Sequence, residues 1–200
     1  MIISTSILNI REDKNKLNLI NKSNTDYIHV DIMDGLFVKN KVDMLDINFD
    51  KKIDIHFMTY NVIDYINKYK HLKPEYITFH IEINENIKKI IDYLKSLSIK
   101  VGIAIKPSTD IKKLLPYLND IDLVLVMSVE PGKGGQTFIK STPNKIKELI
   151  KLRKYYNFLI EVDGGINDET IKLIKNCDIA VSGSYITNND NFNKQIDKLK

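Results

Sequence analysis

One pattern recurs along the whole of this 200-residue chain and constrains its fold more than any other feature. A short run of β-branched and other apolar residues is followed by a polar turn, and then by apolar residues at helical spacing. Runs of this kind are typical of buried strands. Eight strands are predicted in this way, at residues 2–8, 27–33, 53–58, 76–81, 101–105, 123–129, 158–162 and 179–182.

Helical stretches lie between most of these strands. In each stretch the apolar residues recur at i, i+3, i+4 or i+7, which gives a helix one apolar face. The stretches are 87–97, 111–118, 146–150, 171–174 and 192–199. Thr142–Pro143 and Asn167 are predicted to cap the third and the fourth of them. Residues 40–52 give little support for a helix.

Strands that alternate with helices favour parallel β/α units, which close in one of two ways. An open doubly wound sheet usually carries G-x-G-x-x-G after its first strand, and this chain lacks that motif. A (β/α)8 barrel usually takes about 250 residues, with about 200 as its lower limit. We therefore predict one (β/α)8 TIM barrel over residues 1–200, in a short version with reduced helices.

Composition excludes several classes of protein. The chain has 30 Lys and Arg against 26 Asp and Glu, a net charge of +4, and its lysines are spread out rather than clustered as in a nucleic-acid-binding protein. No apolar run approaches the roughly 20 residues of a membrane helix. The first apolar segment lacks the pattern of a secretory signal, and the single cysteine, Cys177, excludes an internal disulfide framework. We expect a cytoplasmic protein whose partners are neither nucleic acid nor membrane.

Polar residues of three predicted strands are expected at one end of the barrel. Residues i and i+2 of a strand share a face, so His29 and Asp31 lie opposite the apolar face of the second strand and point inward. His56 lies near the end of the third strand, and Asp163 stands at the end of the seventh. Two carboxylates in one mouth repel each other unless a cation lies between them. We therefore predict that these four side chains bind one divalent metal, for which zinc, iron, manganese and cobalt are all suitable.

Glycine-rich loops follow the last three predicted strands. They are Pro131-Gly132-Lys133-Gly134-Gly135-Gln136, Asp163-Gly164-Gly165 and Gly183-Ser184. Glycine lets backbone N–H groups approach an anion closely, and barrels often bind phosphate after strands seven and eight. Three such loops side by side predict a phosphate site.

Several of these segments also resemble those of one known family. The motifs are Ser6-Ile7-Leu8, His29-Val30-Asp31-Ile32-Met33-Asp34-Gly35, Asp54-Ile55-His56-Phe57-Met58, Met127-Ser128-Val129-Glu130-Pro131-Gly132 with Gly134-Gly135-Gln136, and Val162-Asp163-Gly164-Gly165-Ile166. In type and order they resemble the ribulose-phosphate 3-epimerase family, and they span nearly the whole chain. The resemblance implies a (β/α)8 barrel, a divalent metal, and interconversion of ribulose 5-phosphate and xylulose 5-phosphate in the pentose phosphate pathway.

The resemblance also implies roles for single residues. Asp31 and Asp163 correspond to two acid/base carboxylates that act through an enediolate, and together with His29 and His56 to the metal ligands. Ser6 corresponds to a serine that contacts substrate. The other positions that the resemblance assigns to substrate are His56, Gly132, Lys133, Gly134, Gly135, Gly164, Gly165, Gly183 and Ser184, and Met33, Met58 and Met127 match methionines around the reacting carbons. It further implies a small sugar phosphate as partner and a homo-oligomer.

The chain departs from the family in its loops. Thr5 stands where proline is usual, Leu36 and Lys39 replace the usual His and Pro, and Lys133 replaces Phe. The segment 40–56 is shorter than is typical. None of these changes removes a predicted ligand or catalytic carboxylate.

Three alternatives remain open from the sequence. An epimerase for a six-carbon ketose phosphate, such as allulose 6-phosphate, uses the same chemistry and differs in its loops. A Schiff-base aldolase would use Lys106, which is expected to point inward from the end of the fifth strand. A catalytically inactive phosphate-binding barrel is the third, because a fold does not determine a function. The presence of all four predicted metal ligands favours the epimerase.

Overall fold

Eight parallel strands close a barrel in the computed structural model, which describes residues 1–44 and 48–200. The nine-stranded sheet runs in the order β1-β9-β8-β7-β6-β5-β4-β2-β3, and a further pairing of β1 with β2 closes the ring and leaves β3 outside it. The strands of the ring are β1 (Ile2–Ser6), β2 (Tyr27–Asp34), β4 (Lys52–Met58), β5 (Tyr76–His80), β6 (Lys100–Ile105), β7 (Leu123–Met127), β8 (Leu159–Asp163) and β9 (Ile179–Ser182). The predicted (β/α)8 barrel is confirmed.

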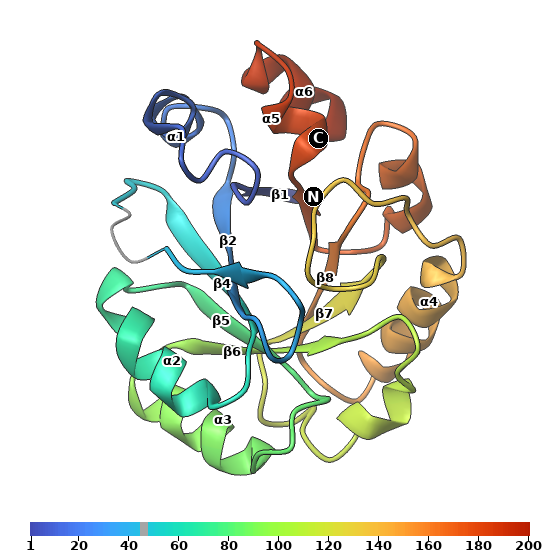
Figure 1. Cartoon of the computed structure of the whole chain (residues 1–200). Coiled ribbons are helices and arrows are strands. Elements are labelled where there is room, and N and C mark those ends of the chain that lie inside the picture. The colour runs from blue at the N-terminus through green and yellow to red at the C-terminus, as the bar shows by residue number, and fades with distance from the viewer. Residues whose placement is uncertain (45–47) are drawn as a thin grey trace.

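Helices surround the ring of strands, as Figure 1 shows in a view nearly along the barrel axis. They are α1 (Lys14–Asn21), α2 (Val62–Tyr69), α3 (Ile87–Ser96), α4 (Thr142–Leu152), α5 (Ser184–Thr187) and α6 (Phe192–Leu199), with the 3-10 helices η1 (Lys70–Leu72), η2 (Ile111–Leu114) and η3 (Thr170–Ile174). The elements after β6 and β8 are single 3-10 turns, so the helical layer is thin there. None of the helices described is long and apolar enough to cross a membrane.

Several predicted element ends were wrong. The helix predicted over 111–118 ends at Leu114, because Pro116 disfavours helical backbone in the residue before it. The first predicted strand ends at Ser6 (β1) and the sixth at Met127 (β7), so the residues beyond them belong to the loops of the barrel mouth.

The predicted caps had mixed outcomes. The Oδ1 atom of Asn167 accepts hydrogen bonds from the backbone N–H groups of Glu169 and Thr170, so Asn167 caps the turn before β9 as predicted, although the residue directly before η3 is Glu169. Thr142 is the first residue of α4 rather than its cap, which is Ser141.

The short β3 (Lys41–Val42) occupies part of the span 40–52 and pairs antiparallel with the end of β2. Met33 lies opposite Val42, and Asp34 opposite Lys41. The weak helical pattern of this span therefore gives a strand at residues 41–42, whereas residues 45–47 lie outside the described part of the chain. This pairing places the chain after β2 along one side of the barrel mouth.

Strand alternation divides the core into two layers. On β2 the side chains of Ile28, Val30 and Ile32 are fully buried between the barrel and the helices. Burial of an aliphatic side chain of this size contributes roughly 1.5–3 kcal/mol. The other face lines the barrel interior, where one apolar cluster comprises Tyr27, Tyr76, Ala104, Leu123, Leu125, Met127, Val129 and Ile179. The polar residues that face inward from the same strands form the candidate site.

Candidate active site

The register between β2 and β4 brings two of the predicted ligands side by side. Asp31 pairs with His56 in this register, and both side chains point into the barrel. Asp163 enters from the end of β8, which is separated from β2 in the closed ring by the two strands β1 and β9. One ligand atom from each of His29, Asp31, His56 and Asp163 lies within 4.8 Å of the others. The structure thus brings together all four residues predicted to bind a metal.

Each of the two histidines directs a bare ring nitrogen, one without a hydrogen-bond partner, toward the same oxygen of Asp31. The Nδ1 atom of His29 lies 2.7 Å from Asp54 Oδ2, which leaves its Nε2 atom 3.4 Å from Asp31 Oδ1. The Nε2 atom of His56 lies 3.0 Å from His80 Nε2, which leaves its Nδ1 atom 3.3 Å from the same Asp31 oxygen. Within the described chain these two nitrogens are buried without a hydrogen-bond partner. Buried polar atoms normally have one, so the arrangement fits a divalent cation.

The pKa values of the two carboxyl groups of the site are shifted in opposite directions. Burial opposes ionisation of Asp31, but His29 and His56 outweigh it and hold the pKa of Asp31 well below its usual range. Burial raises the pKa of Asp163 to about 6, and the neighbouring Asp31 carboxylate adds to this rise. Environments that push two pKa values apart suit an acid and a base acting together.

A second polar layer lies beneath the four residues, and it includes two acids that were missed from the sequence. Asp54 and Glu161 are completely buried, and an oxygen of each lies within 4.8 Å of a ring nitrogen of His29. Burial, strengthened by the charge of Asp54, raises the pKa of Glu161 well above the usual range of a glutamate. Each acid stands two residues before a ligand, Asp54 before His56 and Glu161 before Asp163, and that spacing indicates only that it shares the ligand's inward face.

A second missed pair lies beside His56. His80, at the end of β5, is completely buried, and its Nδ1 atom lies 2.9 Å from Glu82 Oε2. Burial lowers the pKa of His80 to about 4, although Glu82 opposes this shift, so the ring is neutral near pH 7. The H-x-E motif at the end of a predicted strand was the sequence signal that could have indicated this pair.

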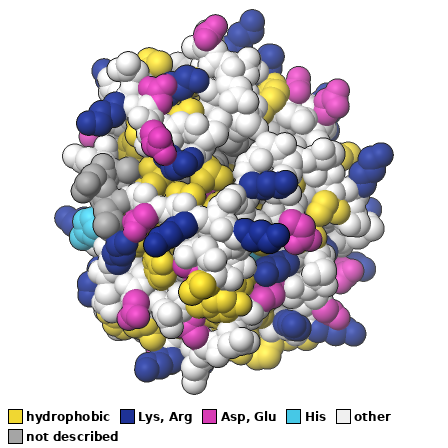
Figure 2. All heavy atoms as spheres, viewed as in Figure 1, with side chains coloured by type: hydrophobic (Ala, Val, Ile, Leu, Met, Phe, Trp, Pro, Cys, Tyr) yellow, Lys and Arg dark blue, Asp and Glu magenta, His cyan; other side chains and the backbone are white. Residues whose placement is uncertain are grey.

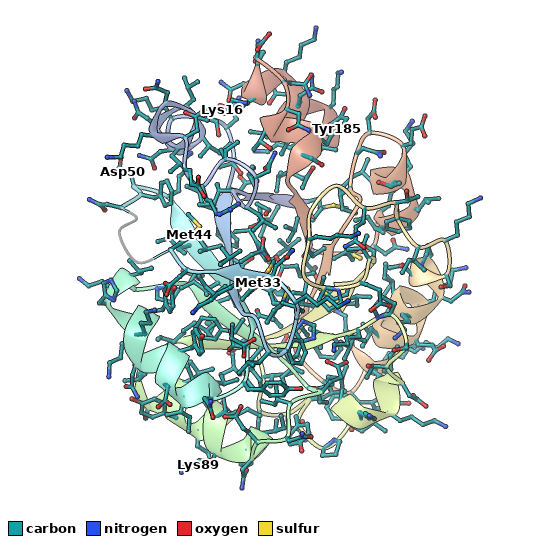
Figure 3. All side chains as sticks on the ribbon, viewed as in Figure 1. Lys16, Met33, Met44, Asp50, Lys89 and Tyr185 are labelled. Carbon is teal, nitrogen blue, oxygen red and sulfur yellow. The ribbon has the colours of Figure 1, made fainter. Side chains whose placement is uncertain are left out.

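A cavity of about 800 Å³ opens above these residues at the mouth of the barrel. Asp31 and Asp163 lie at its floor, and Met33, which Figure 3 labels near the centre of the view, contributes to its wall. The predicted residues that line the cavity also include Ser6, Met58, Met127, Gly132, Lys133, Gly134, Gly135, Gly164, Gly165, Gly183 and Ser184. His29 and His56 lie below its surface, completely buried. Figure 2 shows lysine and arginine side chains on the face that carries this mouth.

The loop after β8 requires glycine at two positions. Gly164 has φ +116°, and a Cβ atom there would lie 2.4 Å from Val129 Cγ2. Gly165 has φ +64°, and its Cβ would lie 2.6 Å from the backbone nitrogen of Phe138. Any other residue would push this loop away from the loop after β7. The close approach brings exposed backbone of both loops to one wall of the cavity.

Ser6, Lys133 and Lys106 occupy different surroundings. The Ser6 hydroxyl donates to Asp31 Oδ2 at 2.9 Å, so it holds the carboxylate at the cavity floor. Lys133 is exposed at the cavity rim. The Nζ atom of Lys106 lies over the ring of Phe37, 4.0 Å from its centroid, and is not among the residues lining the main cavity as described. Lys106 instead borders a smaller adjoining pocket together with Gly132 and Lys133, beside the carboxylates rather than over them.

Known proteins show the same fold and the same sequence pattern. A family model, that of the ribulose-phosphate 3 epimerase family, matches residues 2–187. A ribulose-phosphate 3-epimerase of Buchnera aphidicola subsp. Baizongia pistaciae is 39% identical over 189 residues, which is 88% of this chain and 82% of that protein. Another, of Methanocaldococcus jannaschii, is 34% identical over 209 aligned residues, with 100% of this chain and 87% of that protein covered.

Among solved structures, KGPDC from Streptococcus mutans superimposes with a TM-score of 0.69 at 12% identity and covers 99% of this chain and 94% of that chain. At such low identity this likeness shows the barrel fold alone. The family model and the relatives support family membership as well as the fold, because they match over most of the chain and the relatives do so at higher identity. The chain belongs to the ribulose-phosphate 3-epimerase family and is an enzyme with epimerase activity.

Proposed function

We propose that this enzyme interconverts D-ribulose 5-phosphate and D-xylulose 5-phosphate, with one divalent cation held by His29, Asp31, His56 and Asp163. The observation that carries the proposal is the meeting of two carboxylates and two bare imidazole nitrogens within 4.8 Å at the floor of a cavity of about 800 Å³. The names of the relatives support the choice of a pentose phosphate. A cavity of this volume suits a small ligand.

The reaction inverts a carbinol carbon next to a ketone, so a proton must leave one face and another must arrive at the opposite face. The cation, when bound, supplies Lewis-acid stabilisation for the negative charge that develops on the substrate oxygens. Asp31 and Asp163 approach from two separate strands, β2 and β8, which suits proton transfer on the two faces of one carbon. Positioned acid and base groups each contribute about 10²–10⁴ in rate.

The positions of the two carboxyl groups suggest their roles. Asp31, on β2, accepts the proton that leaves one face of the carbon in one direction of the reaction. Asp163, on β8, delivers a proton to the other face in that direction. The roles exchange when the reaction runs in reverse. Ser6 fixes the orientation of the Asp31 carboxylate through its hydrogen bond.

The glycine-rich loops are the proposed phosphate site. Gly134, Gly164, Gly165, Gly183 and Ser184 border the same cavity, and glycine backbone lets N–H groups reach an anion without obstruction. In this proposal the phosphate binds on the side of the cavity that these loops form, and the ketose carbons lie over the carboxylates.

Proton exchange in heavy water tests the proposal directly. Ribulose 5-phosphate and allulose 6-phosphate are compared as substrates of the metal-loaded enzyme, and deuterium at C3 is measured. We expect deuterium at C3 of both pentose epimers and much slower exchange with the hexose. Faster exchange with allulose 6-phosphate would overturn the pentose assignment, and no exchange with either sugar would indicate an inactive binding barrel.

A further inference from the structure

The polar contacts around His56 continue beyond the predicted metal site. His56 Nε2 lies 3.0 Å from His80 Nε2, and His80 Nδ1 lies 2.9 Å from Glu82 Oε2. The two rings are tilted by 35° with centroids 5.0 Å apart. Both histidines are completely buried. The contacts form one chain from the cavity floor to Glu82.

The chemistry of Glu82 determines the direction of every hydrogen bond in this chain. A carboxylate only accepts, so His80 carries its proton on Nδ1. A neutral His80 then has a bare Nε2, which accepts from the N–H at His56 Nε2. A neutral His56 with its proton on Nε2 has its lone pair on Nδ1. That is the buried, unpartnered nitrogen 3.3 Å from Asp31 Oδ1.

We propose that His80 and Glu82 are positioning residues that hold His56 in the tautomer and orientation in which Nδ1 binds the divalent cation. This inference rests on the proposed function, because it assigns a role toward the same cation site. Neither residue lines the main cavity among the residues described, so neither is proposed to touch the substrate. Hydrogen bonds to the second ring nitrogen of a ligand histidine generally fix its tautomer and raise its basicity.

Glu82 is itself anchored on the side away from His80. Its Oε1 atom accepts from the backbone N–H of Lys106 at 2.8 Å and from the hydroxyl of Thr109. Lys145 donates to the carbonyl oxygens of Lys106 and Thr109, which ties the same loop to α4. Phe37 closes the opposite side, with its ring centroid 4.8 Å from that of His80. The pair therefore has one geometry that satisfies all its partners.

This anchoring predicts an unusual effect of a nearly isosteric substitution. In E82Q the amide oxygen is required by the Lys106 N–H and the Thr109 hydroxyl, so the amide NH₂ group faces His80 Nδ1. His80 must then accept at Nδ1 and carry its proton on Nε2, which it donates to His56. The proton of a neutral His56 is displaced to Nδ1, the atom proposed to bind the cation. The substitution thus reverses the whole chain without removing any side-chain volume.

The test measures zinc affinity by competition with a chromogenic chelator, with folding checked by circular dichroism. We expect E82Q to bind zinc about 10–100-fold more weakly than the wild type. H80Q places an amide oxygen near the former Nε2 position, so it should stay within about threefold of the wild type. H80Q/E82Q should then bind zinc as H80Q does, because Glu82 acts only through His80. E85Q is the matched control, since Glu85 lies in the same loop as Glu82 but accepts from the backbone N–H of Val62 at the start of α2.

A second measurement needs no variant. Long-range ¹H–¹⁵N spectra of the zinc-loaded wild type, labelled at histidine, should show His56 protonated on Nε2 and His80 protonated on Nδ1. Wild-type zinc affinity in E82Q, or a proton on His80 Nε2 in the zinc-loaded enzyme, would overturn the inference. An active wild type that binds no divalent ion would contradict the proposed metal centre itself. Wild-type zinc affinity in E82Q would contradict only the role of His80 and Glu82, so the two failures are distinguishable.

Discussion

The Nδ1 atom of His29 lies 2.7 Å from Asp54 Oδ2, and neither side chain is exposed. The Ser4 hydroxyl donates to the same carboxylate oxygen at 3.3 Å. With Nδ1 occupied in this way, His29 turns Nε2 toward Asp31 and the floor of the cavity. The carboxylate–imidazole pair therefore orients one predicted ligand from beneath, where substrate has no access.

Replacement of Asp54 by asparagine tests this relationship. Asp54→Asn removes the negative charge behind His29, and we expect zinc affinity to fall by about 10–100-fold. A chelator competition titration measures the loss. Asp64→Asn, an exposed carboxylate in the first turn of α2, serves as the control and should bind zinc like the wild type. Equal affinity of the Asp54 and Asp64 variants would show that the pair does not support the ligand.

The two carboxylates at the cavity floor should both be essential. We expect Asp31→Asn and Asp163→Asn to lower epimerase turnover by at least about 10²-fold, since an amide neither accepts nor delivers the proton. Turnover and circular dichroism are measured together to separate catalysis from folding. Asp190→Asn, an exposed change of the same kind, should leave turnover unchanged. More than about a tenth of wild-type turnover in either variant would contradict the two-carboxylate mechanism.

Metal content and activity should fall together when a ligand histidine is removed. His29→Ala and His56→Ala each delete one of the two bare ring nitrogens at the site. We expect both variants to retain less bound metal after dialysis, measured by elemental analysis, and to lose activity in proportion. Activity of the wild type should vanish on exhaustive chelation and return with added divalent ion. Full activity in a sample free of metal would refute the Lewis-acid role.

Lys133 is exposed at the rim of the cavity, and we expect it to contribute little to phosphate binding. Exposed ion pairs contribute about 0–1 kcal/mol, and a flexible lysine stem gains little from one contact. Lys133→Phe and Lys133→Gln should therefore leave the KM within about twofold at low and at high salt. Steady-state kinetics at both salt concentrations check this. A severalfold rise in KM at low salt that shrinks as salt screens the charge would instead assign Lys133 to the phosphate.

Buried His80 should make stability depend on pH. Its pKa is about 4 in the folded enzyme, against 6.5 for an ordinary histidine. Between these values the unfolded chain binds a proton that the folded chain does not, so unfolding free energy falls as pH drops from about 6.5 to about 4 and this contribution is constant below. The full effect is on the order of 3 kcal/mol.

Urea unfolding with chelator present, at pH 7, 5.5 and 4, measures this slope. His80→Gln removes the titrating ring, so its unfolding free energy should decline less than that of the wild type over this interval. Identical slopes for the two proteins would mean that His80 titrates normally in the folded state.

Local sequence determined the strands and the faces of their side chains. Alternation with period two is a property of a single strand, so His29 and Asp31 were placed inside the barrel without knowledge of any neighbour. The same holds for the caps of the turns: Asn167 acts on N–H groups two and three residues away, within reach of local reasoning.

Contacts between strands were decided only by the closed barrel. Asp163 meets Asp31 because β1 pairs with both β9 and β2, which brings β8 and β2 to the same mouth. His80 meets His56 because the stagger between β4 and β5 sets their heights, and no local pattern encodes that stagger. The inward face of a strand follows from its own sequence, whereas the pairing register and the distance between two side chains on different strands depend on the ring as a whole. For that reason the four predicted ligands were found from the sequence, and Asp54, Glu161, His80 and Glu82, whose roles exist only through those ligands, were not.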